Sequence, residues 1–295
     1  MTDLRPQSLG QIRASERGLV LIAALTDYGH GPYTALLEAS ARYPSAPDAT
    51  WLNIDHGIGL GDIRAGALTL RRTVPHLPPC VCVAVVDPGV GTDRRAIALA
   101  TASGHRFVGP DNGLLEPAVR RLGGAVALVD LGASSLRSPV STRTFDGRDL
   151  FGPVAGALAG GAALHDVGVE ADPSSLVGLA LPATQRSGDT FEFRVLEVDH
   201  FGTLVLVLDD QLPALGPLPP VGSSAVLWTR LGGFEELILG ETFADVAPGE
   251  LVIYHDSDGA LSLARRGGSA ATHLHTGVGD TLKVEFQDTD EPSIA

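Results

Sequence analysis

The chain has 295 residues, of which 44% are hydrophobic and 19% are charged, and its formal net charge is −14. This composition is typical of a globular protein with one large or two ordinary domains. The acidity argues against nucleic acid and anionic membrane surfaces as partners, because polyphosphate binding requires clustered cations, and it suits a cationic ligand.

The first part of the chain alternates apolar strands with amphipathic helices. Residues 1–17 are polar and aperiodic, and we expect a tail there. Between residues 18 and 172, strands are expected near 19–26, 51–54, 81–87, 97–101, 106–109 and 125–131, and helices near 32–43, 62–74, 114–122 and 150–161. This alternation predicts an α/β domain with a mainly parallel sheet covered on both faces. Ligands of such sheets bind beyond the carboxyl ends of the strands.

The second part of the chain has a different character. Residues 173–188 are rich in Pro, Ser and Gly, which predicts a linker. Residues 189–295 contain short strands separated by turn residues and no convincing helix, which predicts a smaller antiparallel all-β domain, a sandwich or a barrel. The apolar run at 19–25 is too short to span a bilayer and no basic leader precedes it, so we expect a cytoplasmic protein without membrane contact.

The cysteine and histidine patterns predict no metal site. Cys80 and Cys82 are the only cysteines, too few for a disulfide framework or a four-ligand zinc site, so we expect core thiols. His273 and His275 form an H-x-H pair in a segment that could be a strand, but no carboxylate at metal spacing accompanies them.

A glycine-rich turn offers one alternative function. The stretch WLNIDHGIGLG at 51–61 has the strand, acid and spaced glycines of a Rossmann-like methyltransferase, with Asp87 as the ribose-binding acid. Against this interpretation, the glycines follow the second expected strand and Asp87 lies within a different motif. A flexible glycine loop that leads into a helix is the simpler interpretation of the same residues.

Three motifs place carboxylates beside glycines where a strand ends: VVDPGVGTDRR at 85–95, VGPDNGLL at 108–115 and TFDGRDLFGPV at 144–154. Glycines let the backbone approach a ligand closely. In the first motif they let the loop fold back, so that Arg94 can reach Asp87 and fix the direction of its carboxylate. A salt bridge that merely pins the loop is the competing interpretation.

In their order and spacing these motifs resemble the S-adenosylmethionine hydroxide adenosyltransferases, relatives of fluorinase and chlorinase. The resemblance extends to LTDYG at 25–29, VDHFG at 198–202 and HDSDGALSLARRGGSAA at 255–271. It implies an enzyme that cleaves S-adenosylmethionine to adenosine and L-methionine by in-line attack of water or hydroxide at the ribose C5′, with no cofactor. It also implies a homotrimer whose active sites lie between the α/β domain of one subunit and the β domain of the next. A halogenase of the same superfamily and a non-catalytic S-adenosylmethionine-binding homologue are the alternatives.

The resemblance assigns the positioning or activation of water to Asp87, Arg94 and Asp146. Hydroxide-transferring members usually have His in place of Asp146; a second carboxylate there could accept a proton from water or share one with Asp87. Asp146 could instead cap the following helix, although Asp149 is the expected cap. Halogenating relatives have tyrosine in place of the acid at Asp87, so halide is expected to be a poor nucleophile.

The resemblance also implies a set of substrate contacts. Asp27 would bind the ribose hydroxyls, Asp199 the methionine ammonium and Ser257 the methionine carboxylate. Thr203 stands where the family has an Asn that meets adenine, and Asn112 has the alternative role of a helix cap. The full substrate-binding set is Asp27, Tyr28, Asn112, Asp199, Phe201, Thr203, Ser257 and Ala270.

Overall fold

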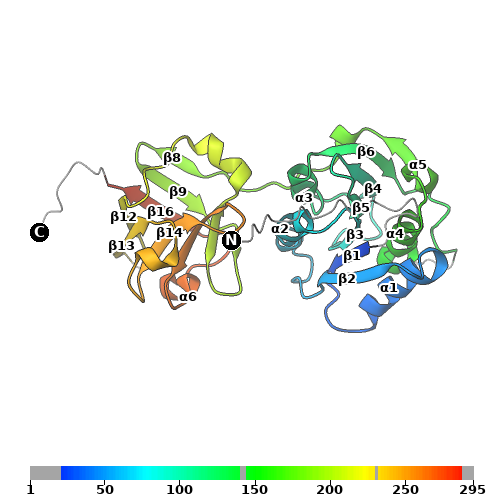
Figure 1. The fold of residues 1–295 in the computed structure, drawn as a ribbon, viewed down its shortest axis with the longest axis horizontal. Coiled ribbons are helices and arrows are strands. Elements are labelled where there is room, and N and C mark those ends of the chain that lie inside the picture. The colour runs from blue at the N-terminus through cyan, green and yellow to red at the C-terminus, as the bar shows by residue number, and fades with distance from the viewer. Residues whose placement is uncertain (1–20, 140–143, 230–231, 288–295) are drawn as a thin grey trace, which may run out of the picture. The chain divides into compact units, whose positions relative to one another are not determined.

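The computed structural model describes residues 21–139, 144–229 and 232–287 of the chain. The chain divides into two compact units, residues 1–179 and 180–295, each with its own hydrophobic core (Figure 1). The boundary between the units falls inside the segment expected to be a linker. The expected tail at residues 1–17 lies outside the described residues.

The first unit is an α/β layer structure. Among the described residues its sheet has seven strands in the order β2-β1-β3-β5-β4-β6-β7. The strands are β1 (Leu21–Thr26), β2 (Thr50–Asp55), β3 (Val81–Val85), β4 (Ala96–Thr101), β5 (Arg106–Pro110), β6 (Ala125–Asp130) and β7 (Val169–Ala171). The α-helices are α1 (Pro32–Ser45), α2 (Ile63–Thr73), α3 (Glu116–Arg121), α4 (Gly152–Ala159) and α5 (Leu164–Val167). Shorter helices are the 3₁₀ turns Val74–His76 and Pro173–Ser175 and the π-helix Gly147–Phe151.

The sheet of this unit is mixed, so the expectation of a mainly parallel sheet was only partly right. Strands β2, β1, β3 and β5 pair in parallel, whereas β4 pairs antiparallel with β5 and β6, and β7 pairs antiparallel with β6. The cause lies in the connections. Residues 86–95 and 102–105 are too short for the crossover that two parallel strands require. The second connection is a tight turn in which Gly104 has a φ of 87°.

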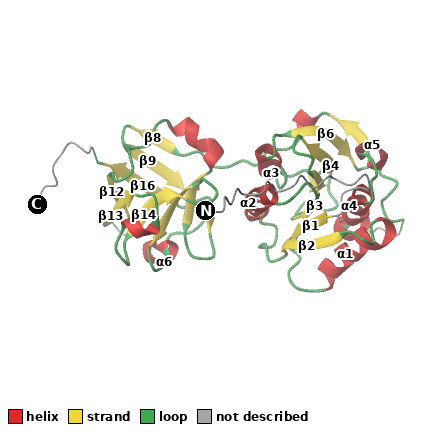
Figure 2. Cartoon of the chain, viewed as in Figure 1, coloured by secondary structure: helices red, strands yellow, loops and turns green. Residues whose placement is uncertain are grey.

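Helices cover both faces of this sheet (Figure 2). Alternate residues of each strand point to opposite faces, and the two cores follow that alternation. Ile22 and Val83 pack with α1 and α4, whereas Leu25 and Cys82 pack with α2 and α3. Both cysteines are buried free thiols, as expected.

The packing of α4 on α1 depends on glycine. Gly152 and Gly156 lie four residues apart, on one face of α4. A Cβ at Gly156 would lie 1.8 Å from the carbonyl oxygen of Ala41, and one at Gly152 would lie 2.0 Å from Ser40 Oγ, so only glycine permits the approach. This contact holds the start of α4, and the π-helix that precedes it, against α1.

The second unit is a β domain. Among the described residues nine strands form one sheet in the order β10-β11-β15-β14-β13-β12-β16-β9-β8. They are β8 (Gln185–Ser187), β9 (Thr190–Arg194), β10 (Glu197–Val198), β11 (Leu204–Val207), β12 (Ser224–Trp228), β13 (Phe234–Leu239), β14 (Leu251–His255), β15 (Leu261–Arg265) and β16 (Thr281–Phe286). Side chains from β9 and β11, which lie far apart in this order, belong to one core, so the sheet curls around it.

Two features of the β domain differ from the expectation of an antiparallel, helix-free domain. Strands β13 and β14 are parallel, because the connection 240–250, which includes the 3₁₀ turn Phe243–Asp245, returns the chain to the end where β13 began. A short helix, α6 (Ala270–Leu274), occupies the segment that carries the H-x-H pair. Ser269 caps α6 by accepting a hydrogen bond from the backbone N–H of Thr272. A further 3₁₀ helix spans Asp209–Leu215.

Candidate active site

Acidic residues follow the carboxyl ends of the four parallel strands. Asp55 ends β2, Asp27 follows β1, Asp87 follows β3 and Asp111 follows β5. Because these strands are neighbours, the four carboxylates lie along one edge of the sheet, where α/β sheets bind their ligands. Asp111 has a structural partner there: it pairs with Arg95 and accepts the backbone N–H of Val177 at 2.8 Å.

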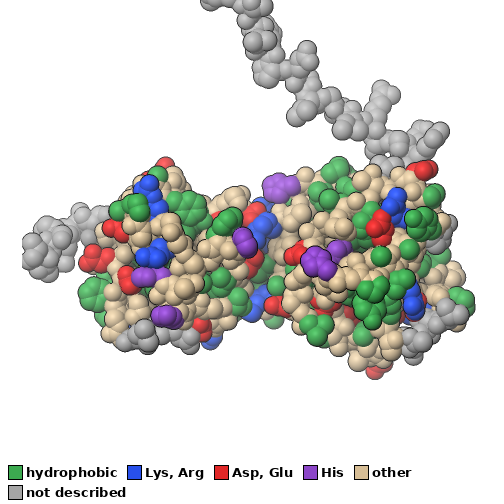
Figure 3. Space-filling view, turned by 90° about the horizontal axis from the view of Figure 1, so that it is seen from below, with side chains coloured by type: hydrophobic (Ala, Val, Ile, Leu, Met, Phe, Trp, Pro, Cys, Tyr) green, Lys and Arg blue, Asp and Glu red, His purple; other side chains and the backbone are tan. Residues whose placement is uncertain are grey.

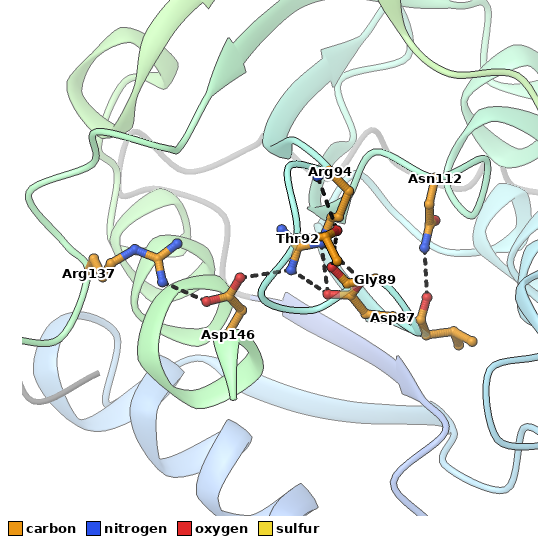
Figure 4. Close-up of polar contacts among 8 residues, drawn as sticks. Asp87, Gly89, Thr92, Arg94, Asn112, Arg137 and Asp146 are labelled. Carbon is orange, nitrogen blue, oxygen red and sulfur yellow. Dashed lines mark hydrogen bonds and ion pairs between the residues drawn. The ribbon is translucent and has the colours of Figure 1, made fainter. Parts of the chain in front are cut away.

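Asp87 and Arg94 form a close ion pair across the loop between β3 and β4 (Figure 4). Arg94 Nε donates to both carboxylate oxygens of Asp87 at 3.0 Å, and its Nη2 donates to Oδ2. The loop folds back through hydrogen bonds from Thr92 to the carbonyl of Gly89 and through Gly91, whose φ of 83° favours glycine. The Asp87 side chain is only 5% exposed. The structure therefore brings these two predicted residues together.

Asp146 joins the same network. Its Oδ2 accepts from Arg94 Nη2 at 2.8 Å, and its Oδ1 accepts from Arg137 Nη1 at 2.6 Å. The Asp146 side chain is 7% exposed. It stands immediately before the π-helix but caps no backbone N–H with its side chain. Asp87, Arg94, Asp146 and Arg137 thus form a linear array of alternating charge (Figure 4).

The expectation that Asp149 caps the helix was wrong. Asp149 lies inside the π-helix, and its carboxylate accepts from the guanidinium of the adjacent Arg148 at 2.6 and 2.9 Å. Arg137 was not anticipated. It lies in an aperiodic segment after β6, and no local sequence signal links it to Asp146.

The two acids of the network change the pKa of Arg94. Burial alone would lower the pKa of Arg94, but its hydrogen bonds and charge interactions, first with Asp87 and then with Asp146, raise it above the ordinary value. The guanidinium also lies over the Phe151 ring, 5.4 Å from its centroid. Arg94 is therefore fixed in its charged form.

Tyr28 lies beside the acidic groups. Burial, followed by the charges of Asp27, Asp87 and Asp146, raises the pKa of the Tyr28 phenol far above its ordinary value, so the hydroxyl stays neutral. The ring packs edge-on against Tyr33 and Phe145. The structure thus brings four predicted residues together: Tyr28 and the three acids whose charges act on it.

Asp27 and Asn112 hold loops in place. Asp27 Oδ2 accepts the backbone N–H of Gly61 at 2.8 Å, which ties the glycine-rich turn to the end of β1. Asn112 Nδ2 donates to the carbonyl of Val86 at 2.9 Å, and its Oδ1 accepts from the N–H of Leu114. Since α3 begins only at Glu116, Asn112 does not cap it. The glycine-rich turn is thus hydrogen-bonded to Asp27, and Asp87 is paired with Arg94. In the methyltransferase interpretation, by contrast, the turn and Asp87 would bind the ligand, so this arrangement does not favour it.

In the β domain the loop 199–203 lies against the start of α6. Asp199 Oδ1 accepts the backbone N–H groups of Phe201 and Thr203 at 2.9 and 2.8 Å. Gly202 has a φ of 80° and packs so closely on Ser269 that a Cβ there would lie 2.0 Å from its Oγ. The N–H of Ala271 donates to the carbonyl of Gly202. Backbone contacts therefore fix this loop.

The other predicted residues of the β domain differ in exposure. Phe201 is 78% exposed, and Ser257 lies exposed in the turn after β14. Thr203 is buried, and its backbone N–H donates to Asp199 Oδ1. The side chain of Ala270 is fully buried, so only its backbone is available to a ligand.

The H-x-H pair does not lie on a strand. His273 is in α6 and its Nε2 lies 3.2 Å from Glu235 Oε1, while His275 ends the helix in a left-handed conformation with a φ of 50°. Within the described part of the chain, no group of three or more His, Cys, Asp or Glu side chains is arranged to hold a metal ion.

Every described helix is too short or too polar to cross a membrane. Described acidic and basic side chains intermingle on the face shown in Figure 3.

The fold and the site together define a two-unit protein in which an α/β domain carries a buried acid–arginine network at the strand ends. Family comparisons agree with this class. The SAM hydroxide adenosyltransferase N-terminal domain model matches residues 22–168, and the corresponding C-terminal domain model matches residues 193–283. The chain belongs to the SAM hydroxide adenosyltransferase family, as its sequence motifs predicted.

Curated relatives and solved structures resemble this chain along most of its length. The (R)-S-adenosyl-L-methionine hydrolase of Salinispora tropica is 43% identical over 89% of this chain and 97% of its own length. The protein of the same name from Thermus thermophilus is 34% identical, over 85% of this chain and 93% of its own. A crystal structure of an uncharacterized conserved protein from Thermotoga maritima has a TM-score of 0.78 and 28% identity, and covers 89% of this chain and 99% of its own.

Proposed function

We propose that the protein hydrolyses S-adenosylmethionine to adenosine and L-methionine. The observation that carries this proposal is the buried network of Asp87, Arg94 and Asp146 at the carboxyl edge of the sheet. Curated relatives with the hydrolase name, which match this chain over more than nine-tenths of their own length, support it. Their names specify the R form of the substrate, and that form is the first to test.

In the proposed reaction a water oxygen attacks the ribose C5′ in line with the C5′–S bond. A bond forms between that oxygen and C5′, while the C5′–S bond breaks and its electron pair stays on sulfur. Methionine therefore leaves as a neutral thioether and needs no acid. One proton of the water stays on the new 5′-hydroxyl, and the other passes to a carboxylate and then to solvent. The protein's task is to orient the water and to accept this proton.

Asp87 and Asp146 are the proposed acceptors. Each carboxylate has about four acceptor positions, and the ion pairs with Arg94 occupy only part of them. Arg94 sits between the two acids and holds both in a fixed direction. Free water is a very weak acid, and a carboxylate that accepts its hydrogen bond can take the proton as the oxygen attacks.

Other residues have proposed roles in substrate binding. Asp27 Oδ1 accepts the ribose hydroxyls, while Oδ2 keeps its bond to Gly61. Tyr28 contacts the substrate beside Asp27, and Asn112 supports the adjoining loop. Three carboxylates near Tyr28 also favour a sulfonium cation at this place.

The β domain supplies the remaining contacts in this proposal. Asp199 Oδ2 receives the methionine ammonium with Phe201 beside it, Ser257 receives the methionine carboxylate, and the backbone of Ala270 meets adenine. Thr203 is buried and takes part through its backbone, which holds Asp199 in place.

We also propose a homotrimer, in which the β domain of one subunit completes the site on the α/β domain of the next. The two sets of proposed contacts lie on different units of the chain, which supports this assembly. Light scattering at micromolar protein is expected to give three times the mass of one chain, and the mass of a single chain would contradict the assembly.

Incubation of the purified protein with S-adenosylmethionine, followed by chromatography, tests the function. Adenosine and methionine are expected, also in molar chloride, because Asp87 and Asp146 repel a halide ion in a site of low dielectric. 5′-Chloro-5′-deoxyadenosine would indicate a halogenase, methylthioadenosine a lyase, and S-adenosylhomocysteine a methyltransferase. Binding without turnover would indicate a non-catalytic homologue.

A further inference from the structure

Arg137 contacts Asp146 but has no assigned role in the proposed reaction. Its Nη1 donates to Asp146 Oδ1 at 2.6 Å, whereas Arg94 Nη2 reaches Oδ2 of the same carboxylate. The two guanidinium groups lie on opposite sides of Asp146 (Figure 4). Among the described residues, Asp146 is the one acid with which Arg137 forms an ion pair. The carboxylate is therefore held at both of its oxygens.

The backbone around Arg137 is fastened to the same elements that carry Asp146. The N–H of Arg137 donates to the carbonyl of Ser134, and Leu136 packs against the core beneath α1 and α4. The N–H of Ser138 donates to the carbonyl of Asp149 at 2.7 Å, inside the π-helix that Asp146 precedes. Since both partners are anchored to the π-helix, the distance between Arg137 and Asp146 is set by the fold.

The charges at the site explain what a second arginine adds. Without Arg137, the buried carboxylates of Asp87 and Asp146 would share one guanidinium, that of Arg94. Two buried carboxylates repel each other, and one guanidinium between them balances only one of their two negative charges, so Asp146 would be held less firmly in place. With Arg137 present, two guanidinium groups balance the two carboxylates, and Asp146 is held by both of them.

We propose that Arg137 is a positioning residue that holds the Asp146 carboxylate oriented toward the attacking water, an inference that rests on the proposed hydrolysis. Arg137 acts through Asp146 and makes no contact with the reacting atoms. A neutral group in place of Asp146 would need no second cation, so the importance of Arg137 depends on the charge at residue 146.

Three variants test this role by steady-state and single-turnover kinetics of adenosine release. Arg137→Gln is expected to lower kcat about 10- to 100-fold with KM within about threefold, since a misplaced catalytic group costs roughly that much. Arg137→Lys restores the charge and is expected to recover most of the loss. Arg95→Gln is the matched control: Arg95 also pairs with a buried acid, Asp111, but outside the network, and its loss should leave kcat within about twofold.

A double-mutant cycle shows whether Arg137 acts through Asp146. With Asp146→Asn as background, measured with excess enzyme so that slow turnover is still quantified, Arg137→Gln is expected to cost less than about threefold. Equal losses in both backgrounds, a loss below twofold in the unmodified background, or no recovery with lysine would overturn the role of Arg137. Absence of turnover by the unmodified protein would overturn the hydrolysis itself, and this inference with it.

Discussion

Gly147 allows the Tyr28 phenol to lie directly against the start of the π-helix. A Cβ at residue 147 would lie 2.1 Å from the Tyr28 hydroxyl oxygen, 3.1 Å from its Cζ and 3.2 Å from Phe145 Cε2. Ordinary contacts begin at 3.4 Å, so Gly147→Ala requires the phenol oxygen and the helix to separate by about 1.3 Å. Neither is free to move, since Tyr28 packs against Phe145 and the π-helix is continuous with α4.

The substitution Gly147→Ala should therefore affect stability and activity together. Overpacking of this kind typically costs 1–3 kcal/mol in the free energy of unfolding. A displacement of about 1 Å near reacting groups can cost roughly 100-fold in rate, and Asp146 directly precedes the altered residue. Urea unfolding at constant temperature and the kcat of adenosine release measure the two effects.

Tyr28→Phe supplies the control for this prediction. Removing the hydroxyl leaves Cζ as the nearest atom of Tyr28, at 3.1 Å, a distance that shifts of a few tenths of an ångström relieve. In the Tyr28→Phe background, Gly147→Ala is thus expected to cost less than about 1 kcal/mol. A loss of stability below about 0.5 kcal/mol from the glycine substitution alone, or an equal loss in both backgrounds, would contradict this role of Gly147.

Three further outcomes are expected. Asp87→Asn should lower kcat about 10²- to 10⁴-fold with little change in KM, the usual effect of losing a general base, and a loss below tenfold in adenosine release would contradict this role. Burial lowers the pKa of His56 and His105 below 6.5, so the unfolded chain binds more protons and the free energy of unfolding should fall as the pH drops below about 6.5. A flat profile in denaturant titrations between about pH 8 and 5 would contradict this. Burial also raises the pKa of Cys80 to about 12, and an alkylating reagent at pH 8 should label it only after unfolding, so rapid labelling of the native protein would be inconsistent with the core.

Much of the α/β unit could be predicted because its strands are buried apolar runs and its helices are amphipathic. The relative direction of neighbouring strands could not be predicted. It depends on which strands become neighbours and on whether the connection between them is long enough to cross over, and the sequence pattern does not reveal which strands are neighbours. The same limit applies to β13 and β14, which are parallel although the surrounding strands alternate. Strand β13 begins with FEE, in which two adjacent glutamates interrupt the alternation of apolar and polar residues.

The site could be predicted where spacing within one loop determines a contact. Asp87 and Arg94 are close in sequence and glycines lie between them, so their pairing follows from the loop. Arg137 reaches Asp146 from a segment without periodicity, and only the anchoring of that segment on the π-helix brings the two together. The H-x-H pair was misplaced because AATHL has no strong preference for a strand, and the cap at Ser269 favours a helix.

Turnover in ¹⁸O-labelled water tests the central claim most directly. If water attacks C5′, mass spectrometry will find the heavy oxygen in the 5′-hydroxyl of adenosine, while methionine remains unlabelled. Adenosine without the label, or label in the methionine, would contradict attack of water at C5′ and with it the roles of Asp87, Arg94 and Asp146.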